Sequence, residues 1–140
     1  MMSKPVLLGM VSALAFYVGS VAAATTSPAG AQAYIISPAD GAEVSSPFKV
    51  QFGLAGMGVA PAGVNKKNTG HHHLLIDTDL PAMDKPIPKD DHHKHFGGGQ
   101  TEVMLDLKPG QHTLQLLMGD KGHIPHKPAV ESSKITITVK

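Results

Sequence analysis

Short segments in which apolar and polar residues alternate recur along this chain, and this pattern limits its possible folds more than any other feature. In residues 48–54, Phe48, Val50, Phe52 and Leu54 alternate with polar residues or glycine. A period of two is typical of a half-buried β-strand. Strand patterns occupy residues 34–36, 48–54, 72–77, 103–107, 114–118 and 135–139. Because no segment after residue 24 has convincing helical periodicity, we predict an all-β fold, a small antiparallel β-sandwich.

Turn residues separate these strand patterns. Pro109-Gly110 lies between the patterns at 103–107 and 114–118, which predicts a β-hairpin. The segment at about 78–100 fits no strand and contains prolines, histidines and three consecutive glycines. A connection of this length in a compact domain is usually either functional or disordered. We predict a functional loop rich in histidine and proline, with a solvated linker as the alternative for residues 81–91.

The first 24 residues have the features of a secretory signal. Lys4 supplies positive charge, residues 6–21 are largely apolar, and Ala22-Ala23-Ala24 is a small-residue cleavage pattern. The apolar run is short for a bilayer span of about 20 residues and is interrupted by Ser12. We therefore expect a periplasmic or secreted protein, with a signal peptide at residues 1–24, a flexible leader at 25–33 and a single domain at 34–140.

Charge and cysteine content exclude several kinds of function. The chain has 12 basic residues, all lysine, against 11 acidic residues. Without arginine or a strong basic excess, neither nucleic acid nor a membrane surface is an expected partner after signal cleavage. The absence of cysteine excludes thiolate zinc, iron–sulfur and blue-copper sites. A bound metal would therefore need nitrogen, oxygen or thioether ligands.

All nine histidines lie between His71 and His126, and most of them are clustered. Imidazole is the commonest protein ligand for metals such as copper, zinc and nickel. Side chains alternate faces along a strand, so His71 and His73 share one face and lie about 6 to 7 Å apart by strand rise. This spacing suits two ligands of one metal. His72 would face the core with Leu74, which predicts a structural role.

The other histidines divide in a similar way. His95 precedes three glycines that allow a close approach of the backbone to a ligand, while His123 and His126 share the loop after residue 118. His112 follows the Pro-Gly turn and is interpreted as structural, with a hydrogen bond to backbone. Residues 92 and 93 are weaker candidates, since they adjoin acids and lysines. The predicted metal ligands are His71, His73, His95, His123 and His126.

Three further side chains are candidates for supporting roles. Asp120 or Glu102 could orient an imidazole by accepting its second N–H, a role that carboxylates often take. Met118 could serve as a soft ligand for a cuprous ion, although a methionine in a strand is more often ordinary core.

Two segments carry a resemblance to a known family. The motifs GHHHLLID at residues 70–77 and HFGGGQTE at residues 95–102 are similar to those of a family of bacterial secreted or periplasmic domains of unassigned function. This resemblance spans most of the chain that follows the signal.

The two ends of the domain resemble a different family, the small periplasmic copper-resistance proteins of immunoglobulin-like fold. The similar segments are residues 37–42 with Pro47, and residues 107–123 with 135–137. The resemblance implies an immunoglobulin-like sandwich and a copper-binding histidine at the place of His123. Two departures exclude an identical site: no histidine is expected at the mature N-terminus, and Lys121 is inserted between Asp120 and Gly122.

These observations predict a periplasmic metal-binding protein that uses its histidine-rich site for metal binding, delivery or tolerance. Copper is the first choice by the affinity order of first-row metals, with zinc and nickel as alternatives. The expected partner is another periplasmic metal-handling protein. Two alternatives stay open: a non-metal envelope interaction or assembly module with solvated or pH-sensing histidines, and a metal-dependent oxidoreductase or hydrolase.

Overall fold

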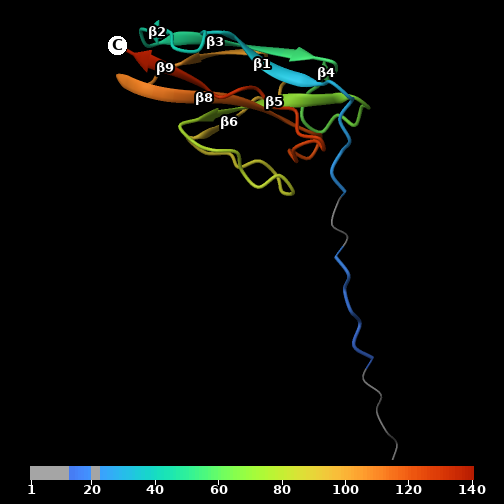
Figure 1. Cartoon of the computed structure of the whole chain (residues 1–140). Coiled ribbons are helices and arrows are strands. Elements are labelled where there is room, and N and C mark those ends of the chain that lie inside the picture. The colour runs from blue at the N-terminus through green and yellow to red at the C-terminus, as the bar shows by residue number, and fades with distance from the viewer. Residues whose placement is uncertain (1–12, 20–22) are drawn as a thin grey trace, which may run out of the picture.

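The computed structural model describes residues 13–19 and 23–140 (Figure 1). Most of the predicted signal peptide at residues 1–24 lies outside these residues, so export stays a prediction. No helix in the described part of the chain is long and apolar enough to cross a membrane.

The described residues form two sheets that pack face to face (Figure 1), which confirms the predicted all-β sandwich. The smaller sheet has the order β1 (Gln32–Ser37), β3 (Phe48–Ala55) and β7 (Glu102–Leu105). The larger sheet has the order β2 (Glu43–Val44), β9 (Ile135–Val139), β8 (Gly110–Gly119), β5 (Thr69–Ile76) and β4 (Gly58–Val59), and β6 (His93–His95) also pairs with β5.

The strand order is that of an immunoglobulin-like sandwich. β1, β3 and β7 take the places of strands A, B and E, while β9, β8, β5 and β6 take those of G, F, C and C′. One detail differs from the expected antiparallel arrangement. β2 runs parallel to β9 and β4 runs parallel to β5, so the larger sheet is mixed.

The predicted hairpin around Pro109-Gly110 is wrong. β7 pairs with β3 in the smaller sheet, whereas β8 pairs with β5 and β9 in the larger one. The chain crosses between the layers after Leu105, and the Leu107 amide donates to Ser46 Oγ at 2.8 Å. Both sheets offer an apolar face, so alternation predicted the strands without indicating which sheet each one joins.

The main core lies between the sheets and a smaller one lies outside them. Val50, Phe52, Leu74, Leu114 and other apolar side chains fill the space between the layers. On the outer face of β5 and β8, Leu75 and Leu117 pack against Ile87 from the loop at residues 78–92. β5 is therefore buried on both faces, including the face that carries His71 and His73.

The proline- and histidine-rich segment contains a strand that was not expected. β6 pairs antiparallel with β5 and places His95 opposite His73. The three-residue pattern His-Lys-His has no apolar alternation, so periodicity could not find it.

Residues 25–33 contact the domain, although they were expected to form a flexible leader. Thr26 forms a β-bridge with Lys127, and the Ser27 amide and hydroxyl donate to Lys127 O and Pro128 O at 3.3 and 2.6 Å. β1 begins at Gln32, two residues before the expected start of order at Tyr34.

Candidate metal centre

Two of the predicted ligands project from one face of β5. His71 and His73 both point to the outer face, and each has only 1% of its surface exposed. Their Nε2 atoms lie 3.0 Å apart. Gly119, on β8 opposite His71, leaves room for this arrangement, since a Cβ at residue 119 would lie 2.8 Å from His73 Nε2.

β6 and the neighbouring glycines position a third imidazole. The pairing of His95 with His73 brings their ring centroids to 5.0 Å, and the His95 ring lies 5.1 Å from that of His71. A Cβ at residue 97 would approach His95 Nε2 to 2.7 Å. Gly97 is therefore needed for the position of the His95 ring.

His123 reaches the same place from a tight turn after β8. Its φ of 66° lies in the left-handed region, which only a few per cent of non-glycine residues adopt. Asp120 Oδ1 accepts the amides of Gly122 and Ile124 at 2.8 and 3.0 Å, and the His123 amide donates to Asp120 O at 2.9 Å. This turn places His123 Nδ1 3.1 Å from His71 Nε2.

The imidazoles of His71, His73, His95 and His123 thus each offer one nitrogen atom to a common point, and these four atoms lie within 4.8 Å of one another. His71 Nε2 makes two short contacts, with His73 Nε2 and His123 Nδ1. A neutral imidazole nitrogen carries either one proton or one lone pair, so both contacts cannot be good hydrogen bonds. Four nitrogens about 2.0 to 2.1 Å from a tetrahedral ion would lie about 3.3 Å apart. The cluster could therefore hold a metal ion.

Burial keeps the innermost imidazoles neutral. Burial, with smaller contributions from His123 and His95, lowers the pKa of His71 to about 4. Burial, followed by the neighbouring His71 and His95, lowers the pKa of His73 to about 3. The pKa of His95 is also lowered, first by burial and then by His123 and Lys89. At neutral pH these three side chains have lone pairs available for a metal without first losing a proton.

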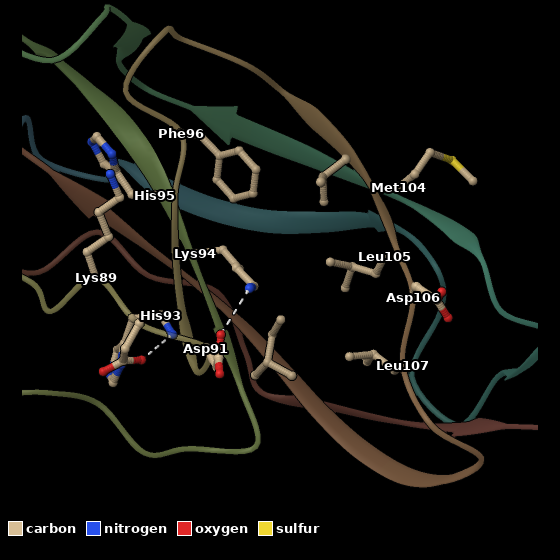
Figure 2. A pocket seen from close by; sticks show the side chains of 13 residues that line it. Lys89, Asp91, His93, Lys94, His95, Phe96, Met104, Leu105, Asp106 and Leu107 are labelled. Atoms are coloured by element: carbon tan, nitrogen blue, oxygen red, sulfur yellow. Dashed lines mark hydrogen bonds and ion pairs between the residues drawn. The ribbon is translucent and has the colours of Figure 1, made fainter.

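The cavity beside the cluster is smaller than a second cavity nearby. A cavity of about 190 Å³ is lined by His73, His95 and His123 together with residues of the loop at 78–92. The larger cavity, of about 740 Å³, lies between the edge strands β6 and β7 and has an apolar wall that includes Phe96, Leu105 and Leu107 (Figure 2). Of the four clustered histidines, only His95 lines it.

The family model for a domain of unknown function, DUF4399, matches residues 50–140. The chain belongs to the DUF4399 family. The matched residues include β5, β6 and the turn that carries His123, and therefore the whole histidine cluster. The resemblance to copper-resistance proteins stays a prediction. Neither the curated proteins nor the solved structures contain a match to this chain.

The fifth predicted ligand, His126, lies beside the cluster in the DUF4399 domain and is not part of the cluster. His126 is buried, and its Nε2 donates to Thr69 O at 3.2 Å. Its ring packs against Gly70, where an added Cβ would lie 2.7 Å from His126 Cε1.

The three supporting candidates are also placed differently from the expectation. Asp120 binds the amides of its own turn and the Thr25 hydroxyl, at 2.7 Å, rather than an imidazole. Glu102 lies on β7 in the other sheet and forms an ion pair with Lys49 at 3.0 Å. Met118 is fully buried in the main core, opposite His72.

The two histidines that were predicted to be structural, His72 and His112, lie outside the cluster. His72 is fully buried, 5.2 Å from the Phe52 ring, and has no hydrogen-bond partner among the described residues. His112 Nε2 donates to Lys108 O at 2.7 Å, and its Nδ1 lies 2.6 Å from Asp77 Oδ2. The hydrogen bond that the Asp77 carboxylate accepts from this ring raises the pKa of His112.

The doubtful pair at residues 92 and 93 lies outside the cluster. His92 Nδ1 donates to Ile76 O at 2.9 Å, and His93 Nδ1 lies 2.7 Å from Asp90 Oδ1. Both histidines therefore help to shape the loop before β6.

Sequence reasoning missed the glycines that make space for the imidazole rings. Gly70, Gly97 and Gly119 each lie where a Cβ would press on a histidine ring. Their sequence neighbours gave a partial signal, because Gly70 adjoins His71 and Gly97 follows His95 closely. Gly119 gave none, since its contact with His73 depends on the pairing of β8 with β5.

Proposed function

We propose that this DUF4399 protein is a periplasmic metal-binding protein that holds one copper ion with His71, His73, His95 and His123. The observation that carries the proposal is the convergence of four imidazole nitrogens within 4.8 Å of one another. Two of these side chains are almost completely buried, and the two short contacts of His71 Nε2 cannot both be good hydrogen bonds. A metal at the common point would accept a lone pair from each of the four nitrogens and so replace these poorly matched contacts.

An all-imidazole site favours copper over zinc and nickel. Imidazole suits copper, zinc and nickel, and the affinity order of divalent first-row metals places copper highest. Neither Met104 nor Met118 belongs to the cluster, since Met104 is exposed on β7 and Met118 lies in the core. The site would therefore bind copper through nitrogen alone. Zinc and nickel are the competing metals in the test below.

The proposed role is to bind copper in the periplasm, for delivery or tolerance. Burial of His71 and His73 protects the ion from solvent, whereas His95 and His123 are partly exposed. An ion bound here would be approached from the side of His95 and His123. A second periplasmic metal-handling protein would exchange copper by that route.

The deciding experiment is a metal titration of the untagged mature protein, from Thr25 onward. Copper, zinc and nickel are each added in competition with a chromophoric chelator, with copper under both reducing and oxidising conditions. We expect one copper ion per protein and weaker binding of the other two metals. The double variant H71A/H73A should lose this binding.

Two further variants make the result specific. His123→Ala removes a partly exposed ligand from a turn, so it tests the site without opening a cavity in the sheet. His112→Gln removes a histidine that lies outside the cluster and outside the elements that carry it, and should bind copper as the parent does. A parent protein that binds no metal above an ordinary protein's level would support the non-metal interaction module instead.

A further inference from the structure

Two groups of residues with different chemistry line the cavity beside the histidine cluster. The first consists of the imidazoles of His73, His95 and His123, and the second consists of Pro86, Ile87 and Lys89 from the loop at residues 78–92. A water molecule occupies about 30 Å³ of liquid volume, so a cavity of about 190 Å³ can admit a molecule of several heavy atoms.

The loop residues that line the cavity are held in place by the smaller core on the outer face of β5 and β8. Ile87 is buried against Leu75 and Leu117, and its amide donates to His123 O at 2.8 Å. Prolines on both sides of Ile87 restrict the backbone, because proline fixes its own φ and limits the residue before it. The loop therefore brings Lys89 to a defined position next to the cluster.

The side chain of Lys89 extends toward the ring of His95 (Figure 2). After burial and His123, the charge of Lys89 is a further cause that lowers the pKa of His95, which is consistent with this proximity. No carboxylate lines the cavity, and Lys89 is the one lysine among its lining residues.

A bound dication would leave this region with excess positive charge. Four neutral imidazoles offset none of the metal's charge. The negative charge of Asp120 favours the protonated form of His71, but the Asp120 oxygens already accept hydrogen bonds from two backbone amides and the Thr25 hydroxyl. An uncompensated charge in a partly buried site is costly, and a counter-ion beside the metal reduces that cost.

We propose that this cavity binds a small monoanion, such as a carboxylate, between the metal and the ammonium group of Lys89. The inference rests on the proposed function. It implies that copper enters and leaves with an anionic ligand, since Lys89 repels a bare cation and attracts an anion. The feature of this chain that carries the inference is the proline-restricted loop that places Lys89 beside the imidazoles.

The test uses the protein loaded with Cu(II) and titrated with azide as the probe anion. Azide binding is followed by the azide-to-copper charge-transfer absorption and by electron paramagnetic resonance. We expect saturable binding with the copper retained. Lys89→Met should weaken azide binding about tenfold, by loss of an attraction between unit charges a few ångströms apart. Lys85→Met, in the same loop but outside the cavity, should bind azide as the parent does.

The outcomes separate this inference from the proposed function. Parent protein that binds copper but not azide overturns the anion site and leaves the metal site standing. Equal azide affinity in the parent and in Lys89→Met also overturns it, as does azide that removes copper from the protein. A failure to bind any copper overturns both.

Discussion

His72 offers a direct test of how burial controls the stability of this fold. Its ring is fully buried beside Phe52, and neither ring nitrogen has a partner among the described residues. Leaving a buried polar group unpaired costs about 1 to 3 kcal/mol. His72→Leu removes this cost and adds apolar contacts, against a repacking cost that is usually below about 1.5 kcal/mol. We expect the free energy of unfolding to rise by about 1 to 2 kcal/mol at about pH 8.

Acid should enlarge this difference. Burial lowers the pKa of His72 from 6.5 to about 4. Because the folded-state pKa is depressed, the stability linked to the neutral ring is complete above pH 6.5 and is lost as the pH falls toward 4. At about pH 4.5 the parent loses roughly 2 to 3 kcal/mol through this group relative to about pH 8. His72→Leu has no such group, so its advantage should grow by that amount.

The assay is urea unfolding followed by circular dichroism, with a chelator present and at both pH values. His72→Ala is the control, because it removes the ring but leaves a cavity and should destabilise the fold. A difference between His72→Leu and the parent that does not change with pH would refute the assigned cause. A variant less stable than the parent at both pH values would show that the cost of repacking exceeds the cost of the unpaired ring nitrogens.

Two other substitutions test the metal site and the ion pair between His112 and Asp77. Gly119→Ala should keep the fold but lower the copper affinity about tenfold or more, because the added Cβ would lie 2.8 Å from His73 Nε2. Competition with a chelator measures the copper affinity of this variant and of the control Gly122→Ala. Equal affinity in the two variants would contradict the prediction. His112→Gln should cost more stability at about pH 6 than at about pH 9, since Asp77 raises the pKa of His112 and that stabilisation is lost as the pH rises through the raised value. Urea midpoints at the two pH values check this expectation, and a pH-independent difference would exclude the ion pair as its cause.

Local patterns predicted the parts of this fold that depend on one strand at a time. The period-two alternation predicted the principal strands because each buries one face against the other sheet. The same parity placed His72 in the core and put His71 and His73 together on the opposite face, as the structure has them. The short strand β6 was missed because it consists of histidine and lysine. The false hairpin arose because alternation does not identify a strand's partner.

The histidine cluster depends on contacts between segments that are far apart in the sequence. Amino-acid sequence alone determined that the chain forms an all-β sandwich, lacks thiolate ligands and concentrates its imidazoles between residues 71 and 126. Only the tertiary structure decided that His95 and His123 join the two histidines of β5, while the His126 ring donates a hydrogen bond to Thr69 O. It did so through the pairing of β6 with β5 and the left-handed turn at His123. Both are long-range or strained arrangements, which neighbouring residues in the sequence do not specify.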